Sequence, residues 1–187
     1  MRTFPLLLVA GLVSACAAGA PRTLSEQYVT YDYGDFFRVA DGKDMTVVVR
    51  GNPFALNQAE FDQLVTSNMA AIPRGPKTNY TTAKSAKADP NYEVVWLFNG
   101  PNLNPNELCS KAQSVPSQSS PANQLRVMAA FCRFDRANSW VEGWVDGGPQ
   151  GVPREGVITL VQQMTRELFP TVNRNDPQKD SCKGPFC

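Results

Sequence analysis

Four short runs rich in apolar, β-branched and aromatic residues constrain the fold most strongly. Residues 45–50 (MTVVVR) and 92–98 (YEVVWLF) are almost continuously apolar, which is typical of central strands that are buried on both faces. Residues 125–134 (LRVMAAFCRF) and 140–145 (WVEGWV) flank a short polar segment and predict a hairpin. The chain is therefore expected to build one sheet around these four strands.

Two amphipathic segments predict helices, and each has a start signal and a stop signal. The first begins at Asn57, which forms an N-cap pair with Glu60, and it ends before Pro73. The second follows Pro153 and ends at Pro170. Apolar residues recur at helical spacing in both segments, and they are Phe61, Leu64, Val65, Met69 and Ile72, then Val157, Leu160, Val161, Met164 and Leu168.

The other segments are predicted from their composition. Residues 28–40 (YVTYDYGDFFRVA) are rich in β-forming residues and predict one or two short strands, and residues 78–82 predict another. Residues 99–123 are dominated by Asn, Pro, Ser and Gln, which predicts a long loop. The pattern predicts an α+β fold, with an antiparallel or mixed sheet and two amphipathic helices packed on one face.

The N-terminus has the form of an export signal. Arg2 supplies a positive charge, and the apolar run over residues 4–13 is too short for a membrane-spanning helix, which needs about 20 residues. The sequence Val13-Ser14-Ala15-Cys16 follows, and it resembles the lipobox of bacterial lipoproteins. The resemblance implies cleavage before Cys16 and diacylation of its thiol. A plain signal peptide with an incidental cysteine is the alternative.

The resemblance also implies a location and a domain organisation. Residues 17 and 18 are alanines, without the aspartate that retains enterobacterial lipoproteins in the inner membrane, which implies lipid anchoring in the outer membrane, facing the periplasm. Residues 51–54 (GNPF) and 94–99 (VVWLFN) are similar to uncharacterised envelope lipoproteins of alphaproteobacteria. We expect a signal peptide over residues 1–15, a lipidated flexible tether over 16–27, a single α+β domain over 28–170 and a polar tail over 171–187.

Charge and composition exclude several functions. Removal of residues 1–15 leaves 172 residues with 17 basic and 17 acidic side chains, because Arg2 is the only charged residue removed. A neutral chain lacks the basic surface that nucleic-acid binding requires. The sequence contains no histidine, which excludes Ser-His-Asp and Cys-His catalysis and histidine metal sites. We therefore expect no enzyme activity, no cofactor and no metal site.

Four cysteines remain after Cys16, and an even number in an oxidising compartment indicates disulfides. Three pairings are possible. We favour Cys109–Cys132, which ties the long loop to a strand, together with Cys182–Cys187, which closes a short loop in the tail. A zinc site made of the four thiolates is a weaker alternative, because the cysteine spacing lacks two matching pairs.

Trp140, Glu142 and Trp144 are the candidate ligand-binding residues. They alternate along one predicted strand and therefore share one face of it. Two indoles that flank a carboxylate form a platform on which a sugar ring can stack, and peptidoglycan lies within reach of an outer-membrane tether. The alternative is that both indoles pack beneath the helix predicted over residues 153–169, while Glu142 meets an arginine.

These observations predict a function class without identifying a partner. We expect a non-enzymatic envelope lipoprotein that acts as an interaction or assembly module, attached to the membrane by its lipid and bound to an envelope protein. The second hypothesis is a periplasmic ligand-binding lipoprotein whose ligand is a glycan or a lipid.

Overall fold

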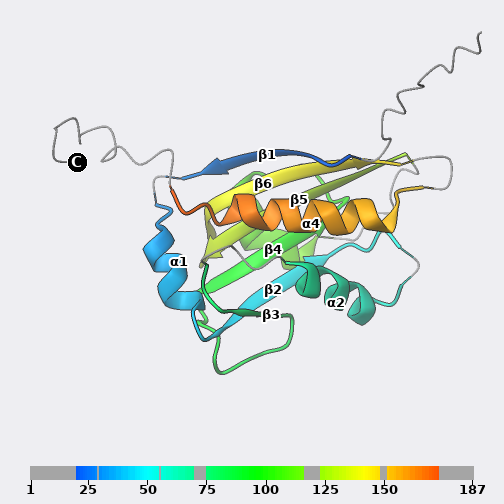
Figure 1. The fold of residues 1–187 in the computed structure, drawn as a ribbon. Coiled ribbons are helices and arrows are strands. Elements are labelled where there is room, and N and C mark those ends of the chain that lie inside the picture. Colours follow the sequence, from blue (N-terminus) through cyan, green and yellow to red (C-terminus); the bar gives the residue numbers. More distant parts are fainter. Residues whose placement is uncertain are drawn as a thin grey trace, which may run out of the picture.

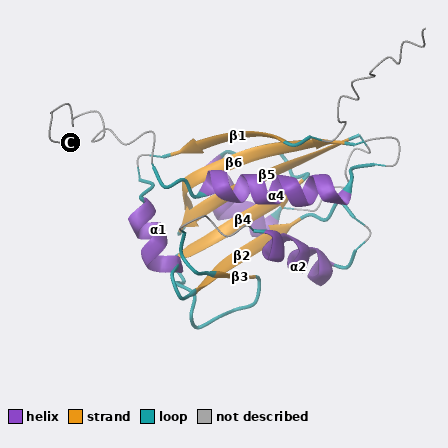
Figure 2. Ribbon diagram, viewed as in Figure 1, coloured by secondary structure: helices purple, strands orange, loops and turns teal. Residues whose placement is uncertain are grey.

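The structure is a computed structural model that describes residues 20–28, 30–54, 56–69, 75–115, 123–147 and 151–172. Within these residues the chain forms a six-stranded sheet with the strand order β1-β6-β5-β4-β2-β3 (Figures 1 and 2). The strands are β1 (Arg22–Gln27), β2 (Asp44–Arg50), β3 (Asn79–Thr81), β4 (Tyr92–Phe98), β5 (Gln124–Arg133) and β6 (Arg136–Asp146). The lipobox with Cys16, and Cys182 and Cys187 of the tail, lie outside the described residues.

The sheet is mixed, which confirms the predicted fold class. Strand β2 pairs in parallel with both β3 and β4, whereas the pairs β4–β5, β5–β6 and β6–β1 are antiparallel. The short strand predicted over residues 78–82 is therefore present as β3, at one edge of the sheet. Strand β1 forms the other edge.

The two predicted helices are α2 (Gln58–Asn68) and α4 (Arg154–Leu168). In α2, Asn57 caps the first turn and Glu60 returns the hydrogen bond, as the sequence predicts. Phe61 of α2 and Leu160 of α4 belong to the same buried cluster, together with Val141 of β6. Figure 1 shows both helices in front of the sheet, so they cover the same face. We refer to it as the helix-covered face.

A third helix, α1 (Tyr33–Ala40), replaces the strands predicted over residues 28–40, and that prediction is wrong for this part. Asp32 accepts a hydrogen bond from the backbone of Asp35 at 2.8 Å and caps the helix. Phe36 is fully buried and stacks on Phe169 with ring centroids 4.0 Å apart. The aromatic residues that suggested a strand therefore belong to a short helix, because tertiary packing of its apolar side outweighs their β propensity.

Residues 22–27 form a strand, so the prediction of a flexible tether is wrong from Arg22 onward. Strand β1 is antiparallel to β6 over its whole length. Its inward-facing Thr23 donates a hydrogen bond to Glu167 of α4 at 2.6 Å and accepts one from Gln163 at 2.7 Å. Apart from Leu24 the segment is polar, which is why its composition predicts a tether. In the structure, Gln163 and Glu167 of α4 supply hydrogen-bond partners for its Thr23.

The loop predicted over residues 99–123 contains a fourth helix, α3 (Pro105–Lys111), which continues into the 3₁₀ turn η1 (Ala112–Ser114). Asn104 and Glu107 form a capping box at its start, and Pro105 occupies the first turn. The predicted disulfide Cys109–Cys132 is present and joins α3 to β5, with Cα atoms 5.7 Å apart. This helix lies on the sheet face opposite α4, where Leu108 belongs to a second buried cluster.

The helices of the described residues are short. No helix among them has both the length and the apolar character needed to cross a bilayer. The longest of the four described helices, α4, has 15 residues, against about 20 that a span requires.

Candidate interaction surface

Trp140, Glu142 and Trp144 lie on one face of β6, as their spacing predicts, and each is half-buried. Their face is the one opposite α4. The alternative in which both indoles pack beneath the helix over residues 153–169 is therefore wrong. The other part of that alternative, that Glu142 meets an arginine, is confirmed, because its carboxylate accepts a hydrogen bond from Arg126.

Gly143 explains why α4 takes the other face. The residues of β6 that face α4 are Val141, Gly143 and Val145, and the two valines are fully buried in the helix-covered cluster. A Cβ atom added at Gly143 would lie 2.6 Å from Leu160 Cδ1 and 2.9 Å from Met164 Sδ. The helix approaches the strand closely at this glycine, and it leaves the tryptophans on the far side.

The strand register places the tryptophans in an ordered surface. Three rows of directly opposed residues cross β1, β6 and β5, and they are Arg22–Trp144–Arg126, Leu24–Glu142–Met128 and Glu26–Trp140–Ala130. We define the indole face as the part of these rows that is not fully buried, namely Arg22, Leu24, Glu26, Arg126, Trp140, Glu142 and Trp144. Two arginines flank Trp144, and each is paired with a carboxylate, Arg22 with Asp146 and Arg126 with Glu142, whereas Glu26 adjoins Trp140.

The polar side chains of the indole face are held in place by one another. Arg126 bridges Glu142 and Asn102, whose amide oxygen accepts a hydrogen bond from Nη2 at 2.7 Å. Trp140 Nε1 donates to Glu26 at 3.3 Å. The Glu142 side chain is only 13% exposed, and Arg126 balances its charge. Glu142 is therefore a structural acceptor with limited freedom to bind a ligand.

Tyr28 completes the Trp140 end of the surface. Its backbone nitrogen donates to the carbonyl of Asn138 at 2.9 Å, and its half-buried ring packs against the second cluster beside Trp140. Burial raises the pKa of the Tyr28 hydroxyl, the carboxylate of Glu26 raises it further, and a hydrogen bond with Trp140 acts in the opposite direction. The phenol is therefore neutral at physiological pH.

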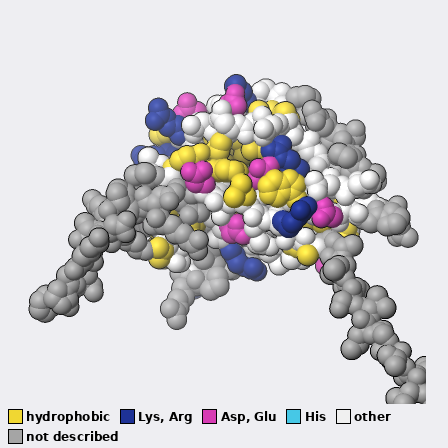
Figure 3. Space-filling view, turned by 90° about the horizontal axis from the view of Figure 1, so that it is seen from above, with side chains coloured by type: hydrophobic (Ala, Val, Ile, Leu, Met, Phe, Trp, Pro, Cys, Tyr) yellow, Lys and Arg dark blue, Asp and Glu magenta, His cyan; other side chains and the backbone are white. Residues whose placement is uncertain are grey.

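Helix α3 covers only part of this side of the sheet. Leu108 and Cys109 pack over Val95, Leu97 and the buried end of β5, and Trp140 borders that cluster. On this side of the sheet, no described helix covers β1 or the Trp144 end of β6. Leu24 is consequently 56% exposed in the middle of β1. Figure 3 looks down on the side where β1 lies and shows hydrophobic side chains together, with acidic and basic ones around them.

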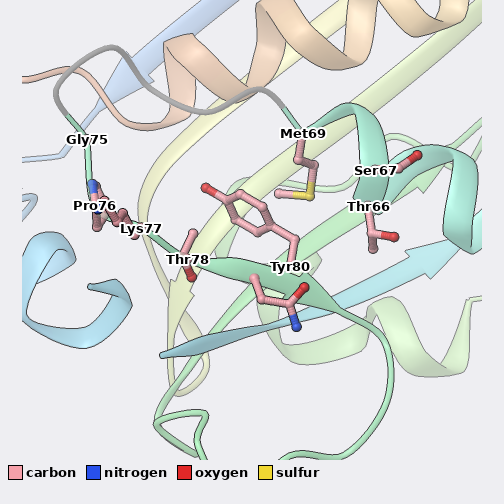
Figure 4. A pocket seen from close by; sticks show the side chains of 9 residues that line it. Thr66, Ser67, Met69, Gly75, Pro76, Lys77, Thr78 and Tyr80 are labelled. Carbon is pink, nitrogen blue, oxygen red and sulfur yellow. The ribbon is translucent and has the colours of Figure 1, made fainter. Parts of the chain in front are cut away.

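A separate pocket of about 460 Å³ lies between the end of α2 and β3 (Figure 4). Tyr80 projects into it beside Met69, and Thr66, Ser67 and Lys77 are part of its polar lining. Burial raises the pKa of the Tyr80 hydroxyl. The described lining contains no carboxylate, and it mixes polar with apolar groups, so it offers no acid–base pair and no continuous apolar wall for an acyl chain.

The zinc site considered for the four cysteines is the remaining predicted site. Among the described residues, no three His, Cys, Asp or Glu side chains are grouped so that they could hold a metal ion. Cys109 and Cys132 are joined to each other, which excludes a four-thiolate zinc site that uses them. Sequence reasoning missed Leu24 and Arg126 as members of the surface. The alternation of Arg22, Leu24 and Glu26 is the signal that identifies an edge strand with one exposed side.

Comparison with known proteins yields a distant structural likeness. No protein-family model matches the chain, and no curated protein matches it. Two solved structures of the PelC dodecamer from Paraburkholderia phytofirmans, one of them a point variant, are similar to it. The variant is 11% identical, covers 82% of this chain and 99% of the PelC chain, and has a TM-score of 0.42. The other is 12% identical, covers 80% and 96%, and has the same TM-score. At this TM-score the likeness carries no functional argument.

Proposed function

We propose that this chain is a lipid-anchored protein of the cell envelope that acts as a non-enzymatic interaction module and binds a protein partner through the indole face. The observation that carries the proposal is the position of Trp140 and Trp144, which are half-exposed on a sheet face that no described helix closes at the β1 end. Tryptophan and arginine dominate the binding energy of protein interfaces, and here Arg22 and Arg126 lie directly beside Trp144.

The composition of the indole face favours a protein partner over an apolar ligand. Leu24 and the two indoles supply apolar area, the Arg126–Glu142 pair lies between the indoles, and Arg22 and Glu26 lie at the two ends, so the face mixes apolar and charged groups as protein interfaces do. The partner that fits places an acidic group near Arg22, whose ion pair with Asp146 is exposed, and a basic group near Glu26. The surface is a sheet face, and none of its residues lines the two pockets described beside α2.

The proposed anchor limits where the partner is found. Cys16 precedes Arg22 by six positions, and six extended residues span at most about 21 Å. A diacylated Cys16 would therefore hold β1, and with it the indole face, close to the membrane surface. This favours a partner that is itself bound to the outer membrane or protrudes from it.

A glycan is the second candidate for the same face. The observation that favours it is the Arg126–Glu142 pair between two indoles, because fixed planar polar groups beside aromatic rings suit sugar hydroxyls and ring stacking. The engagement of Glu142 by Arg126 lowers its capacity to accept hydrogen bonds from a sugar.

Site-specific photocrosslinking in cells separates these candidates. A benzoylphenylalanine at position 144 keeps an aromatic group on the indole face, and the same group in place of Phe37, which is 40% exposed on α1, is the matched control. We expect a discrete adduct with one envelope protein at position 144 and none at position 37.

Purified sacculi provide the comparison for the glycan. If position 144 yields no protein adduct, and Trp144→Ala weakens sacculus binding about fivefold, the value of one stacking contact of about 1 kcal/mol, the glycan replaces the protein as the ligand. If neither result is obtained, the indole face is not a binding surface and the proposal fails.

A further inference from the structure

We propose that two copies of this chain associate edge to edge through β1, pairing antiparallel about a two-fold axis at Leu24 and joining their sheets into one. This inference goes beyond the proposed function, because it concerns the backbone edge of β1, whereas the partner proposed above binds the face. Its occupant is a second copy of this chain. The argument rests on the open edge, on the charge pattern of β1 and on the exposure of Leu24.

Strand β1 lacks most of the features that normally protect a sheet edge. Proteins blunt such edges with very short strands, with charged side chains, with proline or inward-pointing charges, or with bulges, and of these β1 has only the charged Arg22 and Glu26. The opposite edge strand, β3, has only three residues, whereas β1 has six, contains no proline or lysine and keeps a continuous register with β6. Among the described residues, nothing pairs with the outer side of β1.

The sequence of β1 is complementary to itself in one register. When Leu24 of one copy faces Leu24 of the other, Arg22 faces Glu26 at both ends and Thr23 faces Ser25. Directly opposed residues on antiparallel strands contact one another, and opposite charges in such positions stabilise the pair. A parallel arrangement in the same register would place Arg22 against Arg22 and Glu26 against Glu26. Two-fold symmetry requires the antiparallel arrangement, which is the one that the charges favour.

The same register gives the exposed leucine a partner. Leu24 is 56% exposed and lies between Trp140 and Trp144 along the surface. In the paired form the two leucines meet at the axis, and both indole faces lie on the same side of the joined sheet. An apolar strip then continues from the tryptophans of one copy to those of the other, and each Leu24 side chain is shielded from water on the flank that meets its copy.

Existing contacts of the charged residues do not oppose this pairing. Arg22 contacts Asp146 at 3.1 Å, but the two side chains are 61% and 47% exposed. A surface ion pair of this kind contributes little stability, so Arg22 can turn toward a second copy at small cost. The Glu26 carboxylate accepts a hydrogen bond from Trp140 at 3.3 Å, and one carboxylate can accept several hydrogen bonds.

Charge reversal provides a test that identifies the register. The processed, full-length protein is purified in detergent and its mass is measured by sedimentation equilibrium. We expect a reversible dimer, and we expect Arg22→Glu and Glu26→Arg each to raise its dissociation constant about tenfold or more, because each creates two like-charge contacts. Arg38→Glu on α1 is the matched control and should leave the dimer unchanged.

Mixing the two variants is the decisive measurement. In an equimolar mixture, carboxylates at positions 22 and 26 of one variant face guanidinium groups at positions 26 and 22 of the other, so a heterodimer should form at least as tightly as the original dimer. A monomeric parent protein, or a mixture that does not associate, overturns the proposal. If either charge variant fails to fold, Leu24→Cys provides the second test. A residue at the two-fold axis lies beside its own copy, so this cysteine should form an intermolecular disulfide. The absence of that disulfide would also refute the register.

Discussion

Replacing Gly143 with valine tests which face of β6 helix α4 covers. An added Cβ would lie 2.6 Å from Leu160 and 2.9 Å from Met164, and both side chains are fully buried with little room to move. Overpacking of this kind costs about 1–3 kcal/mol. For a domain of this size each kcal/mol lowers the melting temperature by about 2–4 °C, so we expect a fall of about 2–12 °C.

The sign of the Gly143→Val effect is diagnostic, because the opposite orientation of β6 predicts the reverse. If Gly143 faced solvent, valine would stabilise the strand through its higher β propensity. Thermal denaturation followed by circular dichroism measures the change. Trp144→Ala and Trp96→Ala form the comparison pair, with an expected loss of about 3–5 kcal/mol for the fully buried Trp96 and about half that or less for Trp144. A stabilising Gly143→Val, or a Trp144→Ala as damaging as Trp96→Ala, would refute the assigned faces.

Three further predictions concern the anchor, the disulfide and the half-buried carboxyl group of Glu93. Cys16→Ser should abolish labelling by a fatty-acid probe in cells, and unchanged labelling would contradict lipidation. Replacing both Cys109 and Cys132 with alanine should reduce the free energy of unfolding by about 3 kcal/mol, measured by urea denaturation, because the bond closes a loop across a separation of 23 residues; a loss below about 1 kcal/mol would contradict this. Burial raises the pKa of Glu93 above its ordinary 4.5, so ionised Glu93 destabilises the fold at neutral pH and the penalty is relieved as the pH falls toward 4.5. The free energy of unfolding of Glu93→Gln, measured by urea denaturation, should therefore exceed that of the parent protein at pH 7. The difference should shrink as the pH is lowered toward 4.5, and an equal difference at pH 7 and pH 4.5 would count against this reasoning.

The elements that the sequence predicts correctly are those with strong apolar periodicity and clear caps or turns. Strands β2, β4, β5 and β6 and helices α2 and α4 combine strong periodicity with caps or turns, and the sequence predicts all of them. The disulfide was predictable as well, because Cys109 stood in a polar segment that required an attachment. Helix α1 was missed because its aromatic residues have high β propensity, and the helix is favoured by the Asp32 cap together with packing of Phe36 on Phe169 and Phe131.

The candidate surface was predictable in part. The alternation of Trp140, Glu142 and Trp144 established that these side chains share a face, since successive residues of a strand point to opposite sides. It contained no information about which face of the sheet they occupy. The contribution of β1 was also hidden, because its polar residues resemble a tether until Gln163 and Glu167 of α4 are placed beside Thr23.

The sequence by itself determined the α+β class, the central strands, the two amphipathic helices and the sharing of one strand face by the tryptophans. These properties depend on residues close together in the chain, where periodicity and capping act. Only the tertiary structure decided that α4 packs over Gly143, that Arg126 engages Glu142, and that β1 closes the sheet with Leu24 exposed. Each of these depends on contacts between segments far apart in sequence, and their outcome is set by close packing in three dimensions, which local pattern does not specify.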